Sequence, residues 1–125
     1  MTSAIRVLVV DDEPAVRRGL TMRLMLEADV LVVGEASNGE VAIRMADDLR
    51  PDVIVMDVRM PIMDGITATR HLTGIVGHPP IIALSLYDDS TTIDDTMAAG
   101  ASAFIPKSKV DAVLVDTIRR CVSQN

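Results

Sequence analysis

The sequence VLVVDDEP, residues 7–14, joins a run of apolar residues to three acidic residues and a proline. An apolar run without polar alternation is typical of a strand that is covered on both faces, as in a parallel sheet. Pro14 suits the first turn of a helix, because its missing N–H would be unpaired there in any case. The segment therefore predicts a strand that ends at the acidic residues and leads directly into a helix, which is the repeating unit of an α/β fold.

The same unit recurs along the chain. Short runs rich in β-branched residues are separated by amphipathic stretches, and right-handed crossovers between such strands give a doubly wound parallel sheet with helices on both faces. We expect a single flavodoxin-like (βα)₅ domain with strand order 2-1-3-4-5, whose functional groups gather at the carboxyl ends of the strands. The expected strands are Ile5–Val10, Val30–Val33, Val53–Met56, Ile81–Ser85 and Ala103–Ile105.

Helix-start signals lie between these runs. The first helix is expected from Pro14, and the third from Asp64 and Gly65 to about Ile75. Capping pairs predict the other three helices. Ser37 with Glu40 opens a helix to about Leu49, Thr92 with Asp95 opens one that Gly100 closes, and Ser108 with Asp111 opens one to about Val122.

Composition limits the possible functions. The chain has 125 residues, so we expect one domain over residues 1–125 and no room for an output module. A net charge of −6 repels phosphate backbones, and with 2% aromatic residues we expect no direct nucleic-acid binding by this segment. The single cysteine, Cys121, forms no internal disulfide, and neither a signal peptide nor a membrane span is recognisable. These features predict a cytoplasmic protein without membrane contact.

Polar residues follow four of the five expected strands. Asp11 and Asp12 follow the first, Asp57 the third, Ser85 ends the fourth, and Lys107 comes after the fifth. Carboxyl ends of parallel strands meet at one edge of the sheet, so these residues should converge. Three carboxylates brought together repel one another unless a cation lies among them, and Mg²⁺ prefers such oxygen ligands. The sequence therefore predicts a Mg²⁺ site in which a phosphate completes the coordination shell.

These residues lie in segments that resemble a known family, the receiver domains of bacterial two-component response regulators. The resemblance runs in order through VLVVDDEP (7–14), PDVIVMDVRMPIMDGITATR (51–70), PIIALSLYDD (80–89) and AAGASAFIPKS (98–108). VRRGL (16–20), VVGEASNGEVAI (32–43) and Ser108 after Lys107 look most like the NarL/LuxR-type transcription regulators. The resemblance implies a regulator whose DNA-binding module lies outside this chain, with a stand-alone receiver as the alternative.

The resemblance also implies a role for each residue at the sheet edge. Asp57 accepts a phosphoryl group from a phosphohistidine of a partner histidine kinase, and Lys107 contacts the phosphoryl oxygens. Asp12, Asp57 and the backbone carbonyl of Arg59 bind Mg²⁺ directly, while Asp11 holds a metal-bound water. The protein is then a phosphorylation-controlled switch and not an enzyme, although it takes part in its own phosphoryl transfer and autodephosphorylation.

The switch is expected at a few side chains. Ser85 hydrogen-bonds the phosphoryl group, and Phe104 turns inward behind it, although a core role for this sole Phe stays equally open. Tyr87 either reports the state through its rotamer or lies in an exposed loop. Arg59 either affects the phosphoryl lifetime or forms a surface salt bridge. Arg17, Arg18, Arg119 and Arg120 form either a docking or homodimer face or a solvated helix surface.

The fifth strand departs from the common family pattern. Many members have a proline directly after the active-site lysine, often with a cis peptide, whereas Ser108 stands there in this chain. We therefore expect no cis bond at this position. Pro106 lacks a backbone donor, which an edge strand tolerates.

Three other functions fit the sequence less well than the switch. A haloacid-dehalogenase-type phosphotransferase also uses a strand-end aspartate, but it needs a second aspartate where Arg59 stands. A flavodoxin-like carrier of FMN needs hydroxyls and glycines after the first strand, where the acids of residues 11–13 repel phosphate. A degenerate receiver that only binds partner proteins is disfavoured by the complete set of site residues.

Overall fold

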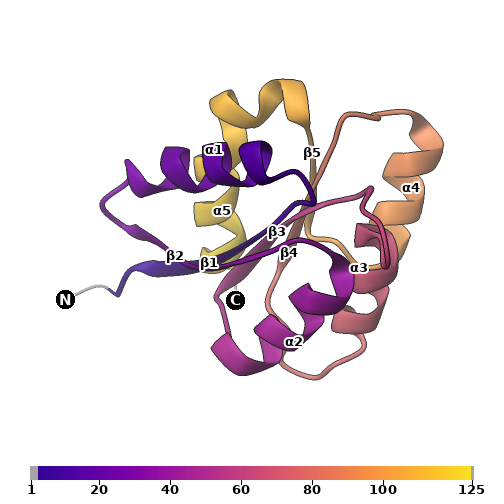
Figure 1. Cartoon of the computed structure of the whole chain (residues 1–125), viewed down its shortest axis with the longest axis horizontal. Coiled ribbons are helices and arrows are strands. Elements are labelled where there is room, and N and C mark those ends of the chain that lie inside the picture. Colours follow the sequence, from indigo (N-terminus) through magenta and orange to yellow (C-terminus); the bar gives the residue numbers. More distant parts are fainter. Residues whose placement is uncertain (1–2, 125) are drawn as a thin grey trace.

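The computed structural model describes residues 3–124 (Figure 1). A five-stranded sheet has the order β2-β1-β3-β4-β5, and each neighbouring pair of strands is parallel. The predicted doubly wound topology is therefore confirmed. The elements in chain order are β1 (Ile5–Val10), α1 (Pro14–Met25), β2 (Val30–Ala36), α2 (Gly39–Leu49), β3 (Val53–Asp57), α3 (Gly65–Thr73), β4 (Ile81–Ser85), α4 (Ser90–Ala98), β5 (Ala103–Pro106), the 3₁₀ turn η1 (Lys107–Lys109) and α5 (Val110–Ser123).

Helices cover both faces of the sheet, which explains why the central strands are apolar throughout. In β1, Val7 and Val9 pack on one side with Leu24 of α1 and with α5, whereas Leu8 and Val10 pack on the other side with α2 and α3. Figure 1 shows α1 and α5 on one side of the sheet and α2 and α3 on the opposite side. A smaller cluster of Val58, Ala83 and Ala101 packs with Ile66 of α3 and Phe104 of β5. Residues of β1, β3 and β4 are thus buried on either face, and alternation would leave polar groups in a core.

Three of the predicted helix starts are wrong by a few residues. The N-cap of α2 is Asn38, whose side chain accepts a hydrogen bond from Val41 N, and not Ser37. The N-cap of α4 is Asp89, which accepts from Thr92 N at 3.0 Å, so the helix begins before the predicted pair Thr92 and Asp95. At the last helix, η1 occupies the predicted cap at Ser108 and α5 begins at Val110 without a side-chain cap. Each predicted cap lies within three residues of the true helix start, but a neighbouring side chain or turn takes the terminal position.

Other boundaries lie close to the expected ones. Pro14 begins α1, and Asp64 caps α3 by accepting from Thr67 N at 2.7 Å. β2 runs on to Ala36 instead of ending at Val33, and α3 ends at Thr73 instead of Ile75. β5 reaches Pro106 and forms the sheet edge, as the missing donor of that residue requires.

Two further findings complete the fold. No cis peptide bond is present among residues 3–124, including the bond after Lys107. Within the same residues, no helix has both the length and the apolar character that crossing a membrane would require.

Candidate functional site

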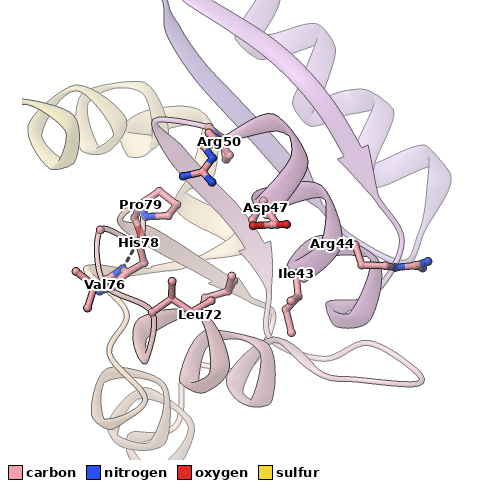
Figure 2. Close-up of a pocket in the computed structure, with 12 residues that line it drawn as sticks. Ile43, Arg44, Asp47, Arg50, Leu72, Val76, His78 and Pro79 are labelled. Carbon is pink, nitrogen blue, oxygen red and sulfur yellow. Dashed lines mark hydrogen bonds between the residues drawn. The ribbon is translucent and has the colours of Figure 1, made fainter.

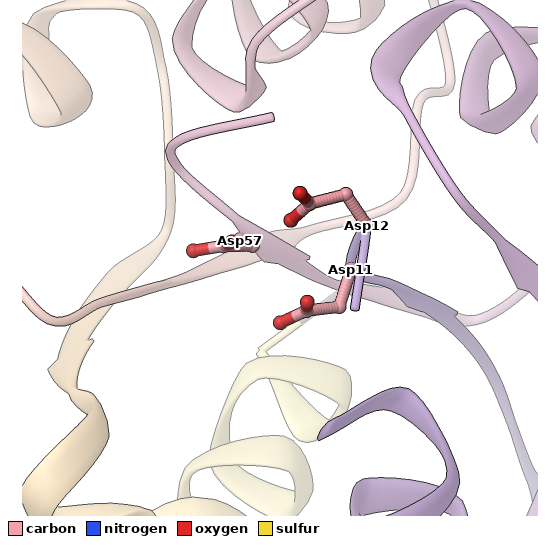
Figure 3. Close-up of side chains that lie close together, drawn as sticks. All are labelled: Asp11, Asp12 and Asp57. Atoms are coloured by element: carbon pink, nitrogen blue, oxygen red, sulfur yellow. The ribbon is translucent and has the colours of Figure 1, made fainter. Parts of the chain in front are cut away.

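The predicted aspartates converge at the carboxyl edge of the sheet. Asp11 and Asp12 follow β1, and Asp57 ends β3, which pairs directly with β1. Each of the three residues offers one carboxylate oxygen, and these oxygens lie within 4.8 Å of one another (Figure 3). Asp11 is fully buried and Asp57 is 6% exposed, while Asp12 is partly exposed. Two nearly water-free carboxylates and one accessible carboxylate therefore share a small volume.

Lys107 reaches this cluster from the end of β5, the last strand in the sheet order. It is the first residue after β5, and its Nζ lies 3.0 Å from Asp11 Oδ2 and 3.4 Å from Asp57 Oδ1. One ammonium group thus bridges two carboxylates that come from different strands. The Lys107 side chain is 17% exposed, so these attractions are weakly screened by solvent.

The cluster perturbs the proton affinity of its members. Burial raises the pKa of Asp57 from 3.8 to about 6, and the negative charges of Asp11 and Asp12 add to this, while Lys107 opposes it. Burial alone would lower the pKa of Lys107, but its hydrogen bond to Asp11 and the charge of Asp57 raise it. Asp57 is therefore a carboxylate held at an energetic cost, with a lysine beside it that stays charged.

Backbone and neighbouring side chains fix the position of Asp11. Its Oδ1 accepts a hydrogen bond from Glu13 N at 2.9 Å, so the carboxylate folds back over the start of α1. Arg17 Nη1 donates to the backbone carbonyl of Asp11 at 2.8 Å, and Arg17 Nε pairs with Glu35 at 3.1 Å. The sequence pattern predicts Arg17 only on the outer face of the helix. Its hydrogen bond to the Asp11 carbonyl was not predicted, because this bond depends on how α1 returns over the end of β1.

Gly65 is a second residue whose part in the site was missed. Its N–H donates to Val58 O at 2.7 Å, and a Cβ placed on Gly65 would collide with the backbone carbonyl of Asp57. The loop between β3 and α3 can therefore close directly behind Asp57 only with glycine here. The sequence signal was the Asp64–Gly65 pair, which was interpreted only as the start of a helix.

Ser85 lies next to the cluster but has a different partner. Asp57 pairs with Leu84 across β3 and β4, so Ser85 lies one residue further along the edge, and it is 1% exposed. Its Oγ accepts a hydrogen bond from Tyr87 N at 2.9 Å. The serine hydroxyl hydrogen is left free to be donated to a group that arrives at the edge.

The remaining predicted residues lie around this edge. Tyr87 is half exposed, and its ring lies under the guanidinium of Arg59, with Arg59 Cζ 4.1 Å from the ring centroid. This cation–π contact replaces the surface salt bridge that was one of the two interpretations of Arg59. Phe104 is partly buried and packs against the cluster of Val58, Ala83 and Ala101. Phe104 thus lies on β5 beside Ala83 of β4, and Tyr87 lies in the loop after β4.

The arginines considered as a docking face are divided. Arg119 pairs with Glu27 and Asp29 at 2.9 Å each, and Arg17 is occupied as described above. These contacts join α5 and α1 to the segment around β2. A homodimer through this face stays a prediction.

The donor set fits a hard divalent cation. Carboxylate oxygens are the ligands Mg²⁺ prefers, and the carbonyl of Arg59 belongs to the same loop that follows Asp57. Burial is the main cause of the raised pKa of Asp57, and the charges of Asp11 and Asp12 add to it, so a bound cation would oppose both effects by favouring the ionised carboxylates. The residues present are therefore suited to hold Mg²⁺.

Comparison with known sequences places this geometry in a family. Residues 7–119 match the family model of the response regulator receiver domain. The transcriptional regulatory protein LiaR of Bacillus subtilis (strain 168) is 41% identical over 115 residues, which cover 92% of this chain and 54% of LiaR. A protein-glutamate methylesterase/protein-glutamine glutaminase of Alkalilimnicola ehrlichii is 46% identical over 108 residues, covering 86% of this chain and 28% of that protein. The chain thus spans about half of one relative and about a quarter of the other.

Solved structures agree with the sequence matches. The receiver domain of NarL from Mycobacterium tuberculosis superposes with a TM-score of 0.92 at 30% identity, covering 99% of this chain and all of that one. A LuxR-family response regulator from Aurantimonas sp. SI85-9A1 gives a TM-score of 0.92 at 32% identity, covering 98% of this chain and 88% of that one. Both support the predicted NarL/LuxR-like character over the dehalogenase and flavodoxin alternatives. The fold, the convergent aspartates and these matches lead to one conclusion, that the chain belongs to the response regulator receiver domain family.

Proposed function

We propose that this domain receives a phosphoryl group on Asp57 from a phosphohistidine of a sensor histidine kinase and thereby switches an output surface. The observation that carries the proposal is the position of Lys107 Nζ, 3.0 Å from Asp11 and 3.4 Å from Asp57. One cation and three converging carboxylates from three segments form a site for charge that is added and removed.

Asp57 is the nucleophile in this proposal. With its pKa raised to about 6, the Asp57 carboxyl group is still mostly ionised at neutral pH. One carboxylate oxygen attacks phosphorus, an O–P bond forms, the N–P bond of the phosphohistidine breaks, and its electron pair returns to the imidazole nitrogen. Desolvation of Asp57 leaves its lone pairs with few competing water contacts, which favours attack on an incoming phosphorus.

The neighbouring residues stabilise the transferred group. Lys107 is placed to move from the two carboxylates to a phosphoryl oxygen, because it already contacts Asp57 through a 3.4 Å ion pair. Asp11, Asp12, Asp57 and the backbone carbonyl of Arg59 would hold Mg²⁺, which supplies positive charge that stabilises the phosphoryl oxygens. Reversal needs water to attack phosphorus, with the electron pair of the O–P bond returning to the Asp57 carboxylate.

The switch begins at Ser85. Its hydroxyl oxygen accepts from Tyr87 N, so when the hydroxyl hydrogen is donated to a phosphoryl oxygen, the change is passed to the backbone of the loop that carries Tyr87. Tyr87 in turn contacts Arg59 of the β3–α3 loop. Phosphorylation would then shift both loops together, with Phe104 repacking beside Ala83, and would change the surface around α4, β5 and α5.

The relatives support an expected cellular setting for this switch. We infer a cytoplasmic two-component system, as is usual for response regulators, and an output module that controls transcription, because LiaR is a transcriptional regulator. The receiver itself acts as a switch and not as an enzyme, since its chemistry ends on its own aspartate.

The proposal is tested by intact mass measurement with acetyl phosphate and Mg²⁺. We expect the wild type to gain the mass of one phosphoryl group and Asp57→Asn to gain none. Asp94→Asn, which changes an exposed aspartate on α4, is the matched control and should gain the same mass as the wild type. Equal modification of wild type and Asp57→Asn would reject Asp57 as the acceptor, and no modification of any variant would favour a receiver that acts only by binding partners.

A further inference from the structure

A second concave site lies at the opposite end of the sheet from the aspartates. It is formed by the last turns of α2 and by the segment from Leu72 to Pro79, and it leads to the amino ends of β3 and β4 (Figure 2). Its volume is about 460 Å³, which lies within the range of small-molecule sites in proteins. No part of the phosphoryl-transfer chemistry involves these residues.

The floor of this cavity is apolar. Leu72 is 2% exposed and Ala46 is 9% exposed, and Ile43 and Pro79 contribute partly buried surface. On the rim, Val76 is fully exposed, so apolar area continues from the floor to the surface. Such a surface gains free energy when an aliphatic group covers it.

Two opposite charges line the cavity without an ion-pair partner in residues 3–124. Asp47 makes no salt bridge and no side-chain hydrogen bond, and the Arg50 guanidinium likewise makes none. Figure 2 shows Asp47 over the middle of the cavity and Arg50 on the side of Pro79, whereas Arg44 extends away from it. The two groups are therefore separate binding points for groups of opposite charge.

The end of α2 strengthens the preference for a cation beside Asp47. The last turn of this helix has two aspartates, Asp47 and Asp48, and no basic residue, at the end where the helix dipole is itself negative. Arg6 Nη1 donates to the Arg50 carbonyl at 2.7 Å, so that backbone oxygen is already satisfied while the carboxylate of Asp47 is not. An ammonium group at this position would relieve the repulsion.

We propose that this cavity binds a small aliphatic zwitterion, of the class of the free apolar amino acids. The aliphatic side chain lies on the floor between Ile43 and Leu72, the ammonium group pairs with Asp47, and the carboxylate pairs with Arg50. A simple anion would approach Asp47 unfavourably, and a simple cation would leave Arg50 without a partner. A zwitterion with an aliphatic body satisfies both charges and the apolar floor.

The test is a titration of ¹⁵N-labelled protein with L-leucine, followed by amide chemical shifts. Two probes share the aliphatic body and lack one charge each: 3-methylbutylamine lacks the carboxylate, and 4-methylpentanoate lacks the ammonium group. We expect saturable shifts confined to residues 43–51 and 72–79, and an affinity for leucine at least about threefold above that for either probe, the size expected for one exposed ion pair. Shifts that do not saturate or spread over the domain, or probes that bind as well as leucine, would overturn the proposal.

Two variants assign the charges separately. Arg50→Gln should lower the affinity for leucine by about threefold or more and leave the affinity for 3-methylbutylamine unchanged. Asp47→Asn should lower the affinity for leucine by a similar factor without lowering the affinity for 4-methylpentanoate. Both side chains are exposed, so we expect the fold to tolerate the two substitutions. Amide shifts that stay unchanged outside the cavity would confirm that each variant is folded. Asp48→Asn and Arg70→Gln make the same charge changes outside the cavity, and equal losses in these control variants would reject the assigned contacts. If the amide chemical shifts of the cavity residues change with protein concentration in the absence of ligand, a second copy of the chain binds at the cavity. That result would also overturn the proposal.

Discussion

Replacing Asp57 by asparagine should stabilise the domain at neutral pH, although it removes an ion pair. The pKa of Asp57 is raised from 3.8 to about 6 in the fold, so the folded state binds a proton more tightly than the unfolded state. Stability therefore falls as the pH rises between these two values. Asparagine has nearly the same shape but cannot ionise, so it avoids this loss.

The size of the effect follows from the shift. A difference of about 2 pKa units corresponds to about 3 kcal/mol of unfolding free energy. Solvent screening reduces it little, because the Asp57 side chain is 9% exposed. The shift is upward despite the nearby ammonium of Lys107, so the repulsion and desolvation of the carboxylate outweigh that attraction.

The assay is urea unfolding of wild type and Asp57→Asn, with a chelator, at about pH 4 and about pH 8. The free-energy difference in favour of asparagine should grow from about 0.5 kcal/mol at the lower pH to about 3 kcal/mol at the higher pH. Titrating groups that do not contact Asp57 are common to both proteins and cancel in this difference. Lys107, which does contact Asp57, has a raised pKa and stays charged at both pH values. Asp94→Asn, the exposed control, should change stability by less than about 0.5 kcal/mol at either pH.

Addition of Mg²⁺ provides an independent arm of the same experiment. A cation that binds only the folded protein stabilises it by about 2.7 kcal/mol at a concentration of about 100 times its Kd. We expect this gain in the wild type and a much smaller one in Asp57→Asn, because one ligand has lost its charge. A difference between the two proteins that stays constant with pH, or that favours aspartate at the higher pH, would refute the account of a strained carboxylate.

Further predictions concern the residues that surround Asp57. Lys107→Met should raise the pKa of Asp57 above 6, measured by ¹³C NMR titration, and should cost about 2 kcal/mol more stability at high pH than at low pH. Gly65→Ala should cost more than about 2 kcal/mol in urea unfolding because its Cβ meets the Asp57 carbonyl, whereas Gly19→Ala, in open space on α1, should gain about 0.5–1 kcal/mol. Ile62 has a φ of 69° and is 78% exposed, so Ile62→Asn, which tolerates this conformation, should gain about 1 kcal/mol of thermal stability. Each explanation has a result that would contradict it. These results are an unchanged pKa of Asp57 in Lys107→Met, equal stability changes in the two glycine variants, and a lower stability of Ile62→Asn.

The sequence predicted the strands and the convergence of the site because both depend on short-range patterns and one rule of topology. Continuous apolar runs identified the buried strands, and parallel strands place their carboxyl ends together, which brought Asp11, Asp57 and Lys107 to one edge. The helix caps were harder. Asp89 and Thr92 stand in a run of residues that can all cap a helix, and which of them does so depends on the direction in which β4 leaves the sheet.

The supporting contacts of the site could not be predicted for a related reason. Arg17 donates to the Asp11 carbonyl only because α1 returns across the end of β1, and Ser85 accepts from Tyr87 N only because the loop after β4 turns back. Neither contact leaves a periodic signal in the sequence. Gly65 did leave a signal, but a glycine after a capping aspartate is equally well explained as an ordinary helix start.

The two ends of α3 contact the proposed phosphoryl site and the proposed zwitterion cavity. Gly65, at its first turn, packs against the Asp57 carbonyl, and Leu72, at its last turn, forms the floor of the cavity. A rigid helix of nine residues therefore contacts both sites, and a shift of α3 on phosphorylation would change the shape of the cavity floor. By linkage, any effect of phosphorylation on ligand affinity must equal the effect of the ligand on the phosphorylation equilibrium. Measuring leucine affinity with and without a stable phosphoryl mimic at Asp57 thus decides whether α3 couples the two ends of the sheet, and identical affinities would mean that they act independently.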